Sequence, residues 1–286
     1  MYKLFSALFL LLMLSCGPTG NNTGDKIITV SIAPFKYFVD EISGGDFKIN
    51  VMVPYGSDPH VYEPFPGQID QLRKSVAYIS NGYLAFEDAW LGRFYETNAT
   101  MVKMSLGDKI EPLENDHDHD GNHAEKADPH YWVSPACALI MASSVRDLLS
   151  ELNPIGKEKY ESNYLKLKSK IEGVDSLAVN LFTGLSNRSF MIYHPNLGYL
   201  ARDYGLEEIT VEYEGKEPSV SRMKELVDRA RADSLKTIFV QKEYDTKNAE
   251  AIANEIDAKV RIIDPLAENW LESVTEIINA LGESMN

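Results

Sequence analysis

Short apolar runs alternate with segments of helical periodicity along most of the chain. From residue 27 onward, the runs predict strands, and the segments between them carry apolar residues at the three- and four-residue spacing of a helix. The strands predicted in the first half are Ile27–Ile32, Phe47–Val53, Val76–Ser80 and Thr100–Met104. The helices predicted there are Phe35–Ile42, Ile69–Lys74 and Phe86–Thr97. This alternation favours an α/β lobe with a mainly parallel sheet.

A second series of the same kind begins at Ser189. Its predicted strands are Ser189–Tyr193, Glu208–Tyr213, Lys236–Gln241 and Lys259–Ile263. Its predicted helices are Leu197–Tyr204, Val220–Ala232, Lys247–Ile256 and Glu268–Leu281. Ser219 stands directly before one of these helices, where a hydroxyl can accept from first-turn amides. The two series together predict two α/β lobes.

The segment between the two series is helical. Ser134 and Pro135 predict the start of a helix that runs to about Leu152, and Asn153-Pro154 ends it. A longer helix is expected over residues 156–185. Its apolar stripe consists of Tyr160, Tyr164, Leu167, Ile171, Val174, Ala178 and Leu181. We therefore expect an N-terminal lobe over 27–155, a linking helix over 156–185 and a C-terminal lobe over 186–286, with a ligand cleft between the lobes.

The first 26 residues have a different character. Lys3 is followed by the mainly apolar run Leu4–Leu14, which is shorter than the roughly 20 residues that a membrane-spanning helix needs. We expect residues 1–16 to be a signal peptide of the lipoprotein type, with the lipid carried by Cys16. An ordinary signal peptide with an incidental cysteine is the alternative. Residues 17–26 (GPTGNNTGDK) have the composition of a flexible tether. The expected location is the periplasmic side of the cell envelope, anchored by lipid.

The net charge and the length of the chain limit the kinds of function that it can have. The chain has 286 residues and a net charge of −15, and it shows no cluster of Lys and Arg. Nucleic-acid binding is disfavoured, because phosphate contacts need concentrated positive charge. A length of 286 residues suits two lobes better than one. Of the two cysteines, Cys137 falls in a predicted helix and is expected to be a small buried apolar residue.

Three of the six histidines lie in an acidic loop expected over residues 105–129. They are His117, His119 and His123, in the run DHDHDGNH. One interpretation is a weak, secondary metal-collecting site. The other is a solvated acidic loop in which histidines occur by composition. Any metal binding here should be weak, because ordering a flexible loop costs backbone entropy.

The remaining three histidines suggest a shared metal site. His60 and His194 follow predicted strands, as does Asp264, and His130 stands in a loop before a helix. Three imidazoles and a carboxylate form a suitable ligand set for zinc, whereas manganese prefers more carboxylate oxygen. Glu63 and Glu243 are candidate ligands by charge alone, and hydrogen bonding or surface exposure explains them as well.

Several motifs resemble those of the metal-specific solute-binding lipoproteins of ABC importers, a family with zinc-binding and manganese-binding members. The resemblance covers nearly the whole chain after the predicted signal peptide. The motifs are Gly56–Pro64 (GSDPHVYEP), Asp128–Trp132 (DPHYW), His194–Leu206 (HPNLGYLARDYGL), Glu217–Ser219, Ile238–Val240 and Asp264–Leu266. The resemblance implies two α/β lobes bridged by one long helix, with one divalent ion between them.

The resemblance also implies ligand roles for His60, His130 and His194. Relatives that carry manganese usually have Glu at the third position, so His194 points to zinc. Asp264 falls where the family often has a carboxylate ligand. Some zinc-binding members use instead a Glu just before the first His, or a water, but Pro59 occupies that place here. We expect Asp264 as the fourth ligand, with water as the alternative.

The implied function is capture of a divalent ion, zinc by preference, and its delivery to an ABC-type permease by a monomeric protein without turnover. Affinity should fall as the pH drops toward the ordinary imidazole pKa of about 6.5, because protons compete for the ligands. Manganese or iron transport is the main alternative. A zinc hydrolase is disfavoured, because no His-Glu-x-x-His helix is present. Nothing in the sequence requires an adhesin.

Overall fold

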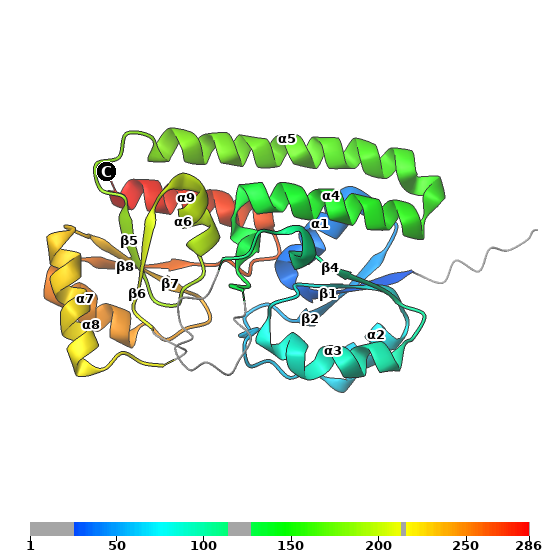
Figure 1. The fold of residues 1–286 in the computed structure, drawn as a ribbon, viewed down its shortest axis with the longest axis horizontal. Helices are drawn as coiled ribbons and strands as arrows, with labels where there is room; N and C mark the ends of the chain where they lie inside the picture. The colour runs from blue at the N-terminus through cyan, green and yellow to red at the C-terminus, as the bar shows by residue number, and fades with distance from the viewer. Residues whose placement is uncertain (1–25, 114–126, 213–215, 286) are drawn as a thin grey trace, which may run out of the picture.

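The computed structural model describes residues 26–113, 127–212 and 216–285, which fold into two α/β lobes (Figure 1). The first lobe has a parallel sheet of β1 (Ile27–Ile32), β2 (Lys48–Val53), β3 (Ser75–Ser80) and β4 (Val102–Ser105) in the order β2-β1-β3-β4. Its helices are α1 (Ala33–Ser43), α2 (Pro66–Arg73) and α3 (Ala85–Thr97). A short 3-10 helix, η1 (Gly107–Lys109), falls inside the stretch predicted to be loop.

The second lobe repeats this architecture. Its sheet consists of β5 (Ser189–Ile192), β6 (Glu207–Thr210), β7 (Thr237–Gln241) and β8 (Lys259–Ile263) in the order β6-β5-β7-β8, again all parallel. Its helices are α6 (Gly198–Tyr204), α7 (Val220–Ala232), α8 (Lys247–Ile256) and α9 (Trp270–Met285). The Ser219 hydroxyl accepts from the amide of Arg222 at 3.2 Å, so the predicted N-cap of α7 is present.

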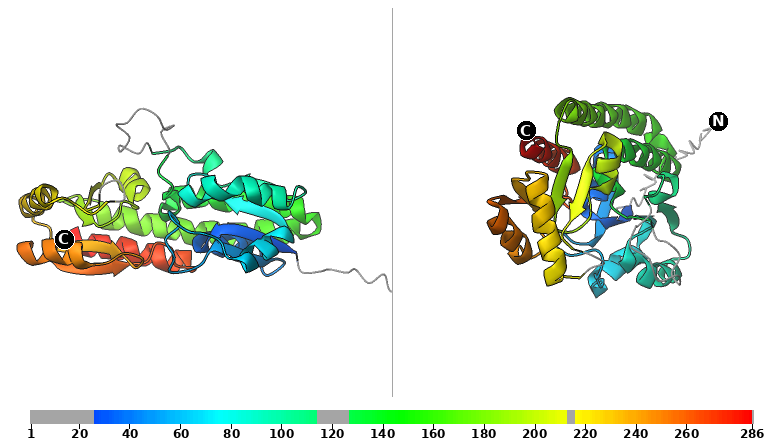
Figure 2. Two further views of the ribbon diagram at one scale, coloured as in Figure 1. Left: turned by 90° about the horizontal axis from the view of Figure 1, so that it is seen from below. Right: turned by 60° about the vertical axis from the view of Figure 1, so that its left-hand side comes forward.

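Two helices and two 3-10 turns connect the lobes. They are η2 (Tyr131–Val133), α4 (Pro135–Leu152), η3 (Pro154–Gly156) and α5 (Lys157–Phe182). Ser134 caps α4 by accepting from the amide of Cys137, whose side chain is buried. Helix α5 extends along both lobes and packs against α1, α4 and α9 (Figures 1 and 2). The fold class is therefore the predicted one, two parallel-sheet lobes joined by one long helix.

The burial of α5 follows its apolar stripe. Tyr160, Leu167, Ile171, Val174 and Ala178 are buried as the spacing predicts. The stripe continues through Phe182, which is also buried. Charged residues dominate the rest of the helix, so its outer face suits water.

One apolar core runs through both lobes. It includes Val30 and Ile79 of the first sheet, Ile171 of α5, and Phe239 and Ile278 of the second lobe. A smaller core lies between the second sheet and helices α7 and α8. Because the larger core is continuous, the lobes are packed as one body rather than tethered as two. Among the described residues, no helix is both long and apolar enough to cross a bilayer.

Candidate metal centre

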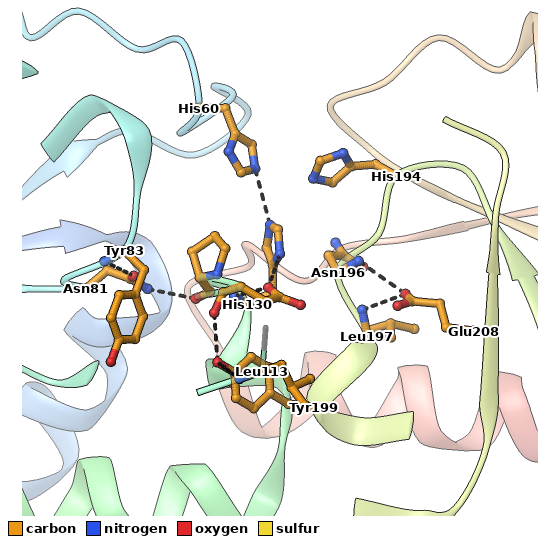
Figure 3. Close-up of polar contacts among 12 residues, drawn as sticks. His60, Asn81, Tyr83, Leu113, His130, His194, Asn196, Leu197, Tyr199 and Glu208 are labelled. Carbon is orange, nitrogen blue, oxygen red and sulfur yellow. Dashed lines mark hydrogen bonds and ion pairs between the residues drawn. The ribbon is translucent and has the colours of Figure 1, made fainter. Parts of the chain in front are cut away.

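Three histidines from distant parts of the chain meet between the lobes (Figure 3). His60 follows β2, His130 directly precedes η2, and His194 follows β5. One ring nitrogen from each lies within 4.8 Å of the other two. The ring centroids are 5.0–5.2 Å apart. The structure thus brings together the three imidazoles that the sequence analysis selected.

The spacing of the first two rings fits a metal ion. Nε2 of His60 lies 3.2 Å from Nε2 of His130. Nitrogen ligands about 2.0–2.1 Å from a tetrahedral zinc ion lie about 3.3 Å from one another. The cavity that the histidines share has a volume of about 20 Å³, which is room for one water molecule or one small ion. A monatomic ion fits this site, whereas an organic ligand does not.

A buried carboxylate orients His130. Asp128 Oδ1 lies 2.7 Å from Nδ1 of His130 and accepts the backbone N–H of the same residue at 2.8 Å. Because a carboxylate accepts, the ring proton belongs on Nδ1, and the lone pair of Nε2 is left for a metal. Burial acts to raise the pKa of Asp128, but the contacts with His130 and the nearby His194 together outweigh burial and lower this pKa.

The segment that carries His130 is fixed from both lobes. The amide of Asn81 donates to the carbonyl of Pro129 at 2.9 Å, from the end of β3 (Figure 3). The Tyr199 hydroxyl of α6 donates to the carbonyl of Asp128 at 2.8 Å. Trp132 donates from its indole to the carbonyl of Pro265 at 2.9 Å. His130 is therefore held at the junction of the lobes rather than on a free loop.

His194 has a carboxylate partner of its own. Its Nδ1 lies 3.0 Å from Oε2 of the buried Glu212, which again leaves the lone pair of Nε2 available for a metal ion. Gln241 at the end of β7 donates to the carbonyl of His194 and accepts its N–H at 3.3 Å. The ring stacks on Tyr244 with centroids 4.8 Å apart. Nε2 of His194 is buried and has no hydrogen-bond partner among the described residues.

Burial keeps two of the imidazoles neutral. It lowers the pKa of His60 to about 2, and the neighbouring His130 and His194 add to the shift. It also lowers the pKa of His194, although the hydrogen bond with Glu212 acts in the opposite direction. A neutral imidazole has a nitrogen lone pair that can bind a metal ion, and it does not repel a cation. Both properties favour cation binding at this site.

Asp264 lies apart from the three histidines. It follows β8 as predicted, but its Oδ2 accepts the hydroxyl of Tyr55 at 2.6 Å and lies 3.7 Å from Nζ of Lys242. It is not among the residues that line the histidine cavity. Its role as the fourth ligand stays a prediction. Cys16, His117, His119 and His123 lie outside the described residues.

The sequence analysis missed the two orienting carboxylates. Asp128 could have been found, because His60 and His130 both occur in the tripeptide Asp-Pro-His. In both copies the aspartate accepts the backbone N–H of the histidine at 2.8 Å. Glu212 has no comparable pattern, since it reaches His194 from the neighbouring strand segment, 18 residues away in sequence.

Comparison with known proteins decides the family. The family model described as "Zinc-uptake complex component A periplasmic" matches residues 28–284. The chain belongs to this family. The description is that of an uptake component rather than an enzyme, so the family gives no support to the hydrolase alternative.

Individual members of the family agree with this assignment. The zinc-binding lipoprotein AdcA of Streptococcus pneumoniae serotype 4 is 26% identical over 98% of this chain, and the chain spans 57% of the length of that relative. The high-affinity zinc uptake system protein ZnuA of Bacillus subtilis is 26% identical over 93% of this chain and 90% of its own length. A crystal structure of ZnuA is 35% identical, with a TM-score of 0.85, and the match covers 92% of this chain and all of that one.

Proposed function

We propose that this protein captures zinc outside the cytoplasm and delivers it to an ABC-type importer in the membrane. The observation that carries the proposal is the convergence of three neutral or carboxylate-oriented imidazoles on a cavity of single-ion size. Relatives in the same family are named for zinc binding or zinc uptake. Zinc is the cargo here, held without chemical change.

His60, His130 and His194 are the proposed ligands, each through Nε2. Three imidazole nitrogens suit zinc better than manganese, which prefers carboxylate and water oxygen. Asp264 remains the sequence-based prediction for the fourth position, with water as the alternative. Tyr55 and Lys242 engage Oδ2 of Asp264, whereas its buried Oδ1 has no hydrogen-bond partner among the described residues, so Oδ1 is the oxygen that would reach the ion.

The setting in the cell envelope belongs to the same proposal. A lipid on Cys16 would hold the protein at the membrane, and residues 17–26 would let the folded body reach a permease. We propose that the body acts as a monomer on the periplasmic side. His117, His119 and His123 are proposed as a weak, secondary collecting loop, with a solvated acidic loop as the alternative.

The test is a competition titration of the metal-free protein with zinc and with manganese. We expect one tight zinc site, weaker manganese binding and a large loss of zinc affinity in His194→Ala. Manganese binding equal to or tighter than zinc binding would overturn the choice of metal. Wild-type affinity in His194→Ala would overturn the ligand set.

A further inference from the structure

His60 is held differently from the other two histidines. The rings of His130 and His194 each have a carboxylate at Nδ1, whereas the ring of His60 is hydrogen-bonded to the ring of His130. The His60 segment, residues 54–65, also runs along the surface, and Val61 in it is 76% exposed. The orientation of His60 therefore depends on the contacts that hold this segment.

Two successive turns connect His60 to Tyr55. The amide of Ser57 donates to the carbonyl of Pro54 at 3.1 Å, which closes the first turn. The side chain of Asp58 accepts the backbone N–H of His60 at 2.8 Å, which closes the second. Because both turns restrict the backbone, a movement of His60 out of the cavity would also pull on Tyr55.

Tyr55 ties the His60 segment to the second lobe. Its hydroxyl donates to Oδ2 of Asp264 at 2.6 Å and accepts from the ammonium of Lys242. That ammonium also lies 4.5 Å from the centroid of the Tyr55 ring and 3.7 Å from Oδ2 of Asp264. The three residues therefore form one connected group across the cleft.

The partners of Tyr55 in the second lobe are close in sequence to the support of His194. Lys242 begins the turn that follows β7. The turn continues through Glu243, which lines the histidine cavity, to Tyr244, which stacks on the ring of His194. The contacts of Tyr55 thus connect the segment that carries one histidine to the turn that supports another.

These contacts oppose the movement that release of an ion needs. An ion bound by three imidazoles cannot leave while all three rings stay in place. Buried carboxylates hold the rings of His130 and His194, so His60 is the ligand that is free to move away. For His60 to move, its segment has to loosen, and the bonds of Tyr55 to the second lobe resist this.

The contacts of Tyr55 do not have to change when an ion binds. Tyr55 and Lys242 engage Oδ2 of Asp264, whereas Oδ1 has no hydrogen-bond partner among the described residues. The contacts are therefore compatible with either candidate for the fourth position, Asp264 or water. A contact that is equally strong in the loaded and the empty protein does not alter the equilibrium affinity. It slows both entry and release if it must break for the ion to pass.

We propose that the Tyr55–Lys242–Asp264 group positions the His60 segment and sets the rates at which the ion enters and leaves. Tyr55 and Lys242 act as positioning residues and do not touch the ion. This inference rests on the proposed function, because it needs an ion on His60, His130 and His194.

The test measures both rates on the purified protein with zinc. Release is followed by mixing zinc-loaded protein with excess chelator, and entry by stopped-flow mixing of metal-free protein with zinc. In Tyr55→Phe we expect both rates to rise roughly 2- to 5-fold, the effect of losing one ordinary hydrogen bond at an exposed site, with Kd nearly unchanged. Wild-type rates in this variant, or a rise in one rate alone, would overturn the inference.

Tyr62→Phe is the matched control. The Tyr62 hydroxyl donates to Oε1 of Gln68 at 2.7 Å, inside the first lobe. The substitution removes the same atom from the same segment and breaks no contact across the cleft, so we expect wild-type rates. Equal acceleration in Tyr62→Phe and Tyr55→Phe would mean that any loosening of the segment suffices, and it would overturn the inference.

A second variant tests whether the group acts as a unit. Lys242→Met should also raise both rates, and the effect of the double variant with Tyr55→Phe should fall short of the product of the two single effects. A full product would mean that the two residues act independently, which would contradict the proposal. Failure of the wild-type protein to bind zinc tightly would instead refute the proposed function, on which the inference rests.

Discussion

The hydroxyl of Tyr55 donates to Oδ2 of Asp264 at 2.6 Å and joins the two lobes beside the histidine cavity. Tyr55 follows β2 in the first lobe, and Asp264 follows β8 in the second. Lys242 completes the group, with its ammonium 4.5 Å from the centroid of the Tyr55 ring. This Tyr55–Lys242–Asp264 group is one of several polar contacts between the lobes, and its tyrosine is exposed, whereas the larger apolar core runs through both lobes.

Removing the Tyr55 hydroxyl tests the strength of this contact. Tyr55 is 51% exposed, so water can replace the lost partner, and Tyr55→Phe should lower the free energy of unfolding by only about 0.5–1 kcal/mol. Urea unfolding of the metal-free protein measures this. If Asp264 does not ligate the ion, zinc affinity should be unchanged in the same variant. A large gain in zinc affinity would show that Tyr55 competes with the metal for Asp264.

The repeated Asp-Pro-His tripeptide provides a matched pair of substitutions. Asp128→Asn keeps an oxygen for the backbone N–H of His130 but removes the carboxylate from its ring nitrogen. We expect zinc affinity to fall roughly 10- to 100-fold, because the tautomer of His130 is no longer fixed. Asp58→Asn is the control, since the hydrogen bond that the structure gives Asp58 with His60 is to the backbone N–H alone. Equal losses in both variants would argue against a role for Asp128 in orienting the ring.

The buried state of His60 predicts how stability depends on pH. Its pKa is about 2 in the folded protein, against about 6.5 for an ordinary imidazole in the unfolded chain. Between these values the unfolded chain binds more protons, so the free energy of unfolding rises with pH. This contribution is complete above pH 6.5 and is lost as the pH falls, at about 1.4 kcal/mol per pH unit well below 6.5.

Urea unfolding of the metal-free protein at pH 7.5 and pH 5 measures this dependence. We expect the protein to be less stable at pH 5 by roughly 1–2 kcal/mol on account of His60. His60→Gln should show a flatter dependence, because the titrating ring is gone. An identical pH dependence in the variant would mean that other groups account for the loss. For the same reason, competition between protons and zinc at His60 and His194 should begin below the pH that an exposed imidazole predicts.

The parts of the fold that depend on local periodicity could be predicted from the sequence. The strand–helix alternation gave two parallel-sheet lobes, and the stripe from Tyr160 to Ala178 gave the long helix. The predicted ends of helices were less accurate where the sequence has no clear capping residue. Helix α9 continues to Met285 rather than ending at Leu281, because its apolar face goes on to pack in the core.

The three histidines could be selected because imidazoles are few and two of them follow strands. The sequence could not indicate which carboxylate faces them. Glu212, Glu243 and Asp264 all follow or end strands of the same sheet, and only the direction of each side chain separates them. That direction depends on turn geometry and on partners such as Tyr55, which is more than 200 residues from Asp264 in sequence.

The apolar core that runs through both lobes has a consequence for the proposed delivery of zinc to a permease. Opening the cleft would expose buried side chains such as Trp132 and Trp270 to water, so we expect the outline of the protein to change little when an ion binds. A permease that accepts loaded copies and declines empty ones must therefore sense the short turns around the histidines. The loaded and empty forms would then differ in the positions of a few side chains at the mouth of the cleft and not in the shape of the whole protein.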